Sequence, residues 1–174
     1  GNPSGKTVDT FAKSLDDYPS TYNFHESRDY VDYTDDIYVG YRYFETIPGA
    51  AEKVVYPFGY GLSYTTFDVE TVSAGVVNSN CTSEANKLYA KVRVTNTGKF
   101  SGKEVVQVYI AKPQGKLGKP AKELAAFEKT RELQPGESQL MILTWEINDM
   151  ASYDDLGKVK KSAYVLEAGS YDIY

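Results

Sequence analysis

The feature that most restricts the fold is a regular alternation of apolar and polar side chains over residues 87–96. The apolar positions are Leu88, Ala90, Val92 and Val94, and the polar or amphipathic positions between them are Tyr89, Lys91, Arg93 and Thr95. Successive side chains of a β-strand point to opposite faces of the sheet. The pattern therefore predicts a strand with one face in a hydrophobic core, ended by the turn sequence at residues 96–99.

The rest of the chain after Phe67 repeats this signature. Runs typical of strands are expected at residues 66–77, 104–111, 122–133, 139–147, 164–166 and 171–174. A Gly/Lys/Pro loop at 113–120 and a proline turn at 134–137 separate some of them. About seven short strands joined by turns are typical of an immunoglobulin-like or fibronectin III-like β-sandwich. The expected fold class is therefore mainly β.

The run at residues 139–147 predicts where the core lies. Its alternation places Met141, Leu143, Trp145 and Ile147 on one face and Leu140 and Ile142 on the other. We expect Trp145 between the two sheets, near Val92, Val106, Val108 and Leu143. The second, apolar face is expected to point outward, where such a face often marks a contact surface.

Residues 1–67 have a different composition. They hold ten of the sixteen tyrosines, with ten acidic and five basic residues, whereas residues 67–174 hold fourteen of each. The net charge of −5 thus belongs to this first part. Breaker residues interrupt every apolar run, and no helix of ordinary length is predicted. We expect a largely irregular, aromatic-rich arm at 1–67 ahead of a sandwich at 68–174.

The segment VVYPFGYGLSYTTF, residues 54–67, is the most unusual part of the arm. It holds five aromatic rings, two glycines and one proline, and it carries no charge. Ordering a backbone costs about 1–2 kcal/mol per residue, which loop residues offset only by burying apolar surface. We therefore expect these rings to be buried against the sandwich, against the arm or against something outside this chain.

Several classes of partner and cofactor are not expected. The net charge of −5 argues against nucleic acid and against an anionic membrane surface. The stretch GNPSGKT has three residues between its glycines where a P-loop has four, so a plain turn is expected there. His25 is the single histidine, which argues against zinc. The acids at Asp29, Asp32, Asp35 and Asp36 lack the glycine and terminal glutamate of a calcium loop. We expect neither cofactor nor metal.

The chain contains one cysteine, Cys81, so it cannot form an internal disulfide. The core of the sandwich must then rest on apolar packing. A single cysteine fits a reducing compartment, and a cytoplasmic location is favoured over secretion.

Six stretches of the sequence together resemble one family. In order they are NPSGKTVDTF, DDIYVGYRYFET, VVYPFGYGLSYTTF, VRVTNTGKFSGKEVVQVYI, KELAAFEKTRELQPGES and VLEAGSYDIY. This ordered set, which covers nearly the whole chain, resembles glycoside hydrolase family 3. The resemblance implies the C-terminal edge of that family's α/β-sandwich domain, followed by its fibronectin III-like domain. YPFGYGLSYT then corresponds to the connector between the two.

The resemblance also implies what lies elsewhere. In the family the nucleophile is an aspartate of a (β/α)₈ barrel and the acid/base is usually a glutamate upstream of this region. Retaining hydrolysis needs two carboxyl groups about 5 Å apart, and neither can be placed on these residues. We therefore expect no catalytic residue here and no activity of the chain alone. The expected partners are the catalytic barrel and α/β-sandwich domains of a parent β-glucosidase, or of a β-xylosidase, with the barrel before or after this region.

Substrate, a β-glucoside or oligosaccharide, would then be met through the parent enzyme. The candidates for contact with it are Tyr41, Arg42 and Tyr43. Aromatic faces and a guanidinium suit carbohydrate, but they also make ordinary packing and cation–π contacts. Packing, a contribution to the parent's cleft and a free-standing sugar site all remain open. The alternative function is an independent carbohydrate- or protein-binding β-sandwich module.

Overall fold

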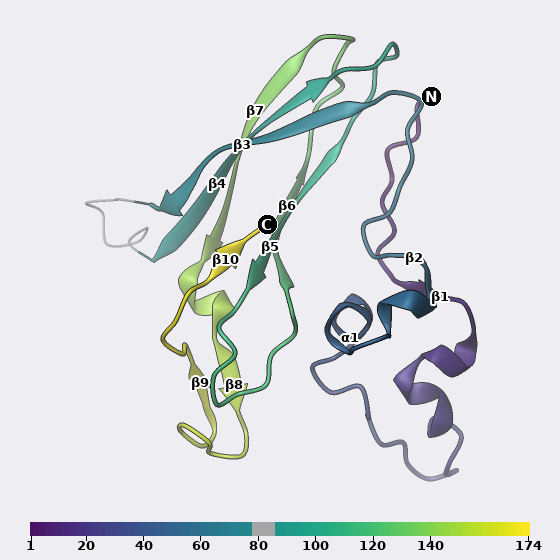
Figure 1. Ribbon diagram of the computed structural model, residues 1–174, viewed down its shortest axis with the longest axis vertical. Helices are drawn as coiled ribbons and strands as arrows, with labels where there is room; N and C mark the ends of the chain where they lie inside the picture. Colours follow the sequence, from purple (N-terminus) through teal and green to yellow (C-terminus); the bar gives the residue numbers. More distant parts are fainter. Residues whose placement is uncertain (78–85) are drawn as a thin grey trace.

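The computed structural model describes residues 1–77 and 86–174, so Cys81 lies outside the described residues. Two antiparallel three-stranded sheets face each other (Figure 1). One has the order β3 (Phe67–Val76), β4 (Lys87–Asn96), β7 (Ser138–Glu146). The other has the order β10 (Asp172–Ile173), β5 (Val105–Ala111), β6 (Glu123–Lys129). The prediction of a mainly β sandwich of fibronectin III-like type is confirmed.

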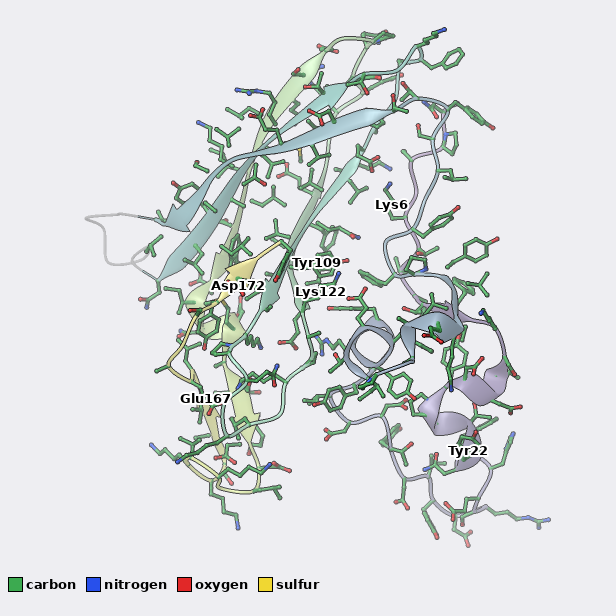
Figure 2. The ribbon with its side chains drawn as sticks, in the orientation of Figure 1. Lys6, Tyr22, Tyr109, Lys122, Glu167 and Asp172 are labelled. Carbon is green, nitrogen blue, oxygen red and sulfur yellow. The ribbon has the colours of Figure 1, made fainter. Side chains whose placement is uncertain are left out.

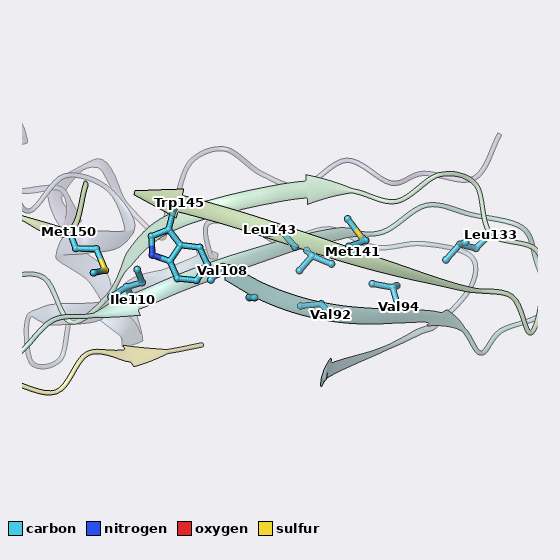
Figure 3. Close-up of a cluster of buried hydrophobic side chains, with 11 residues drawn as sticks. Val92, Val94, Val108, Ile110, Leu133, Met141, Leu143, Trp145 and Met150 are labelled. Carbon is cyan, nitrogen blue, oxygen red and sulfur yellow. The ribbon is translucent and has the colours of Figure 1, made fainter. Parts of the chain in front are cut away.

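The core lies between these sheets, where the alternation predicted it (Figure 3). In the register of β4 and β7, Leu88 lies opposite Trp145 and Val92 lies opposite Met141, so their side chains share the inner face. Trp145 is 5% exposed and packs in one cluster with Val108. The remaining predicted neighbours, Val92, Val106 and Leu143, belong to the same cluster. Leu140 and Ile142 are exposed on the outer face, also as predicted.

Several predicted boundaries were wrong. The strand expected at residues 122–133 ends at Lys129. Leu133 makes only an isolated bridge to Gly102, although the Leu133 side chain is fully buried. The strand at 139–147 stops at Glu146 because residues Ile147–Met150 turn as a 3₁₀ helix. β9 (Ala163–Val165) overlaps the strand expected at residues 164–166, but its partner in a hairpin, β8 (Ser152–Asp154), was not predicted. Three-residue strands are too short to give a clear alternation.

The arm lies beside the sandwich (Figure 1). It contains one short helix, α1 (Tyr41–Thr46), and a small ladder of β1 (Phe11–Ala12) with β2 (Val54–Tyr56). Three 3₁₀ turns complete it, at Leu15–Asp17, Pro19–Tyr22 and Ala51–Lys53. The arm is thus largely irregular, and its α-helix has six residues.

Residues 1–7 are extended, which corrects the prediction of a plain turn. They run alongside the aromatic connector, residues 56–65 (Figure 1). The N–H of Thr7 donates to the Tyr60 carbonyl at 2.8 Å, and the N–H of Gly59 donates to the Thr7 carbonyl at 2.8 Å. These long-range hydrogen bonds satisfy backbone groups that a local turn would otherwise pair internally.

We expect Trp145→Ala to lower the free energy of unfolding by about 3–5 kcal/mol, the usual loss for a large buried aromatic side chain. Leu140→Ala, on the outward face of the same strand, is the matched control and should change it by about 0.5 kcal/mol. Denaturant unfolding followed by circular dichroism measures both. Equal midpoints for the Trp145 variant and the unmodified chain would remove Trp145 from the core.

Candidate functional site

The predicted site residue Tyr41 lies where the arm meets the sandwich. Its ring stacks at 4.7 Å on Phe58 of the connector and meets Tyr109 of β5 edge-on at 5.9 Å, between centroids. Its hydroxyl oxygen accepts a hydrogen bond from the backbone N–H of Leu124 at 2.8 Å. Burial, followed by the charges of Tyr41 and Glu45, raises the pKa of Tyr109 to about 12. Tyr41 thus joins arm, connector and sandwich through one side chain.

The other two predicted residues also contact protein groups. The guanidinium of Arg42 lies 3.5 Å from the Glu123 carboxylate, with 38% of the Arg42 side chain exposed. Tyr43 packs edge-on against Phe44, which is buried. Tyr41, Arg42 and Tyr43 therefore lie on one turn of helix but contact different neighbours. Their contact with a sugar stays a prediction.

Charged and polar contacts fasten α1 to the start of β6. Lys122 pairs with Glu45 at 3.1 Å and lies 4.8 Å above the Tyr109 ring, as the side chains in Figure 2 show. The Thr46 hydroxyl accepts the N–H of Ala121 at 2.8 Å. Exposed ion pairs contribute little individually, so the stacked rings supply most of the stabilisation at this junction.

The connector needs its two glycines for different reasons. Gly59 has φ of +78°, a conformation that L side chains rarely adopt, and a Cβ there would also collide with the Gln107 side chain. At Gly61 a Cβ would collide with the Gly5 carbonyl oxygen of the extended N-terminus. The close approach of these two segments therefore excludes a side chain at residue 61.

The expected burial of the connector is only partly correct within this chain. Phe58 is packed as described, and Tyr56 and Tyr60 lie 5.1 Å apart. Leu62 and Tyr64, however, are each 71% exposed. Within the described residues this part of the connector is therefore only partly covered, although Tyr64 lies beside Gly1 and Asn2.

Asn2 is a structural residue that no sequence pattern singled out. Its side-chain oxygen accepts hydrogen bonds from the Ser63 hydroxyl and the Tyr64 N–H, both at 2.9 Å. Its side-chain nitrogen donates to the Ser101 carbonyl at 2.9 Å. A second tie comes from Lys6, whose ammonium lies 2.7 Å from the Glu104 carboxylate. The start of the chain thus fixes the connector to the sandwich.

A second buried ion pair closes the loop after β5. Lys119 is 3% exposed and bonds the Glu167 carboxylate, which also accepts the N–H of Lys116 at 2.7 Å. The Lys119 hydrogen bond, with these backbone donors, holds the pKa of Glu167 below its ordinary value. This pair orders the Gly/Lys/Pro loop, and no local pattern in the sequence indicated it.

The ordered loop forms one wall of a cleft of about 420 Å³ between the arm and the β8–β9 hairpin. Side chains of the wall include Tyr38, Leu117, Glu123, Tyr153, Asp154 and Lys158. Rings and charged groups in such a space can accept a polar ligand. Its most buried carboxylate, however, is engaged: Asp154 accepts four backbone N–H groups, those of residues 157–160, at 2.7–3.0 Å.

The four hydrogen bonds set the protonation of Asp154. Burial opposes ionisation of this carboxyl, but the N–H groups of Val159, Lys160, Lys158 and Gly157 outweigh it and lower its pKa below the ordinary value. The ionised Asp154 carboxylate therefore stabilises the hairpin and is not suited to proton transfer.

Two features are absent from residues 1–77 and 86–174. Within these residues no group of three or more His, Cys, Asp or Glu side chains is placed to hold a metal ion. No helix in the same residues has the length and apolar character needed to cross a membrane.

Comparison with known proteins gives a consistent result. The family model for the fibronectin type III-like domain matches residues 104–174. Beta-glucosidase A of Butyrivibrio fibrisolvens is 61% identical over 99% of this chain, which covers 22% of that protein. A beta-glucosidase of Ruminococcus albus is 46% identical over 99% of this chain, which covers 17% of it. The chain thus spans about a fifth of the length of the curated relatives it matches.

Solved structures agree with the sequence relatives. The chain superimposes on a beta-glucosidase of Paenibacillus barengoltzii with a TM-score of 0.90 and 52% identity, over 99% of this chain and 18% of that one. Beta-glucosidase 3B of Thermotoga neapolitana, in complex with glucose, gives 0.85 and 42%, over 99% and 22%. The arm and the sandwich are both included in these matches.

We expect Gly59→Val and Gly61→Val each to destabilise the chain, Gly59→Val by about 1–3 kcal/mol for the strained φ alone. Gly5→Val is the control, because a Cβ at Gly5 meets nothing within 4 Å, and it should change stability by about 0.5 kcal/mol or less. Thermal unfolding compares the three variants. If both connector variants unfold at the temperature of the unmodified chain, the close packing of the connector is not a source of stability.

Asp154→Asn tests the hairpin through its pH dependence. Because the folded-state pKa of Asp154 is lowered, the stabilisation from its carboxylate is present above the unfolded pKa of about 3.9. It is lost as pH falls through the lower folded pKa. Asp154→Asn should therefore lower Tm relative to the unmodified chain at pH 7, with a smaller difference at pH 3. An equal difference at both pH values would contradict the role of the ionised carboxylate.

Proposed function

This chain belongs to glycoside hydrolase family 3, within the region that carries the fibronectin type III-like domain, and from this we propose that it scaffolds the catalytic domains of a β-glucosidase. The chain itself carries no catalytic group in this proposal. Substrate, a β-linked glucoside or oligosaccharide, is bound and hydrolysed by the remainder of the enzyme.

The observation that carries the proposal is the contrast in burial between the two parts of the chain. The sandwich has a continuous buried core. The arm, in contrast, fully buries only Phe44 and Ala50 among its described apolar residues. It leaves many large apolar side chains open to solvent, among them Val8, Leu15, Tyr22, Tyr33, Leu62 and Tyr64. Monomeric proteins rarely expose contiguous apolar surface beyond a few hundred Å². The exposure of these side chains supports the proposal that the catalytic domains cover the arm.

The junction at α1 supports a mechanical role. Tyr41 stacks on Phe58 and contacts the sandwich, while Lys122 and Glu123 hold Glu45 and Arg42. A catalytic domain seated on the arm would therefore be held at a fixed position relative to the sandwich. In this proposal Tyr41, Arg42 and Tyr43 act on the parent's sugar cleft by fixing α1, and the exposed part of Arg42 is the group available for direct contact.

The division of the chain follows the same proposal. Residues 1–67 form the edge of the α/β-sandwich domain with its connector, and residues 68–174 form the fibronectin III-like domain. The connector passes directly into β3, which begins at Phe67. A boundary there would separate the segment that needs outside cover from the segment with its own core.

The isolated chain is expected neither to hydrolyse p-nitrophenyl β-glucoside or β-xyloside nor to bind cellobiose by calorimetry, because no catalytic carboxyl pair is placed on it. The complete enzyme, assayed in parallel, provides the positive control. Turnover that disappears when one of the chain's acids is mutated would overturn the scaffold proposal. Cellobiose binding without turnover would favour the independent carbohydrate-binding module, with the cleft beside Tyr38 and Tyr153 as its site.

A further inference from the structure

A second, smaller cavity, partly open to the surface, lies at the junction next to the single tryptophan. It measures about 100 Å³, and its walls come from α1, β5, β6, β7 and the 3₁₀ turn that follows β7. The lining residues are Arg42, Ile110, Lys112, Glu123, Leu124, Ala125, Trp145, Asp149 and Met150. The cavity thus connects the arm with the core of the sandwich.

The indole nitrogen of Trp145 carries a hydrogen-bond donor that no protein group accepts. Trp145 is 5% exposed, its Nε1 is buried, and among the described residues no acceptor lies within bonding distance. The nitrogen is on the edge of the ring that faces Met150 and Ile110, which also line the cavity (Figure 3). A buried donor left unpaired costs about 1–3 kcal/mol, and buried tryptophan N–H groups usually find a partner.

The charged groups of the cavity wall do not supply that partner. Both oxygens of the Glu123 carboxylate are engaged, one facing the Arg42 guanidinium at 3.5 Å and the other paired with the Lys112 ammonium. The Lys112 side chain is only 7% exposed, so its remaining N–H groups also point into protein. The cavity wall is therefore rich in donors.

Size and charge narrow the chemistry of an occupant. The two cations and the two carboxylates of the wall, Glu123 and Asp149, balance in formal charge, which favours a neutral molecule over an anion. Ligand pockets for larger molecules measure about 300–1,000 Å³, so a sugar ring does not fit this cavity. A water takes about 30 Å³ of liquid volume and needs two to four polar partners.

We propose that this cavity is an internal hydration site, in which an ordered water accepts a hydrogen bond from Trp145 Nε1–H. The other hydrogen bonds of this water go to the charged groups of the wall, Arg42 of the arm among them. The water then joins the arm to the core of the sandwich. This inference does not depend on the scaffold proposal, because it concerns only contacts within the chain.

The chain has one tryptophan, so its indole N–H gives a single, directly assignable signal in a ¹H–¹⁵N spectrum. We expect a dipolar cross-peak between that proton and water whose sign is that of a long-lived water. We also expect the indole proton to exchange slowly for deuterium. Slow exchange would show that the cross-peak comes from a bound water and not from chemical exchange of the proton with solvent. A protected indole proton without a water cross-peak would show a dry cavity and overturn the proposal.

Filling the cavity gives the matched test. Ala125→Leu adds three carbon atoms at the wall and should abolish the water cross-peak while the indole proton stays protected. Ala74→Leu, the same change at an exposed position of β3, should leave the cross-peak intact. If Ala125→Leu does not fold, Ala125→Val serves instead. A cross-peak that survives the filling variant contradicts the site. So does an indole signal that moves on adding glucose or sodium chloride, since the occupant would then be a sugar or an anion.

Discussion

The packing of β4 and β7 against β5 is the interaction on which the other features depend. Val94 and Leu133 are fully buried, and Ile110 and Trp145 extend the same cluster toward the arm. Each large aliphatic or aromatic side chain buried in this way contributes roughly 1.5–3 kcal/mol. Without a disulfide among the described residues, this burial is what fixes the two sheets. It therefore also fixes Tyr109 and Leu124, the two residues of the sandwich that Tyr41 contacts.

The arm depends on that platform. Its own regular structure is limited to a six-residue helix and a short ladder, which leaves little internal packing to offset the cost of ordering its backbone. Long-range contacts supply the difference: Asn2 reaches Ser101, Thr7 pairs with the connector, and Tyr41 packs between Phe58 and Tyr109. The arm is thus ordered on one side by the sandwich, and its other side keeps the apolar residues exposed.

The sequence predicted those parts of the fold whose signal is local. The alternation over β4 and β7 was enough to place Val92, Leu143 and Trp145 in the core, because the two-residue period of a strand links sequence directly to burial. Loop structure was predicted less well. Lysine is almost never buried unless paired, yet Lys119 is buried through Glu167, which lies 48 residues away. No local pattern indicates such a partner.

The candidate site shows the same division. The motif containing Tyr41, Arg42 and Tyr43 was predicted as a candidate for contact with a sugar, and that contact stays a prediction. The residues that fix the motif, Lys122 and Glu123, lie in a run that predicted only a strand. The hairpin around Asp154 was missed because its stabilisation comes from backbone N–H groups meeting one carboxylate. Such hydrogen bonds leave no compositional signal.

The central claim is that the exposed side of the arm is covered in the complete enzyme. Tyr33→Ala tests it most directly, because Tyr33 is 94% exposed in this chain. Tyr164→Ala is the control, an equal truncation of an exposed tyrosine on β9 of the sandwich. We expect Tyr33→Ala to leave the Tm of the isolated chain unchanged but to lower the Tm and the β-glucosidase activity of the complete enzyme. Tyr164→Ala should have the same small effect in both. An unchanged Tm of the complete enzyme with Tyr33→Ala would contradict the account.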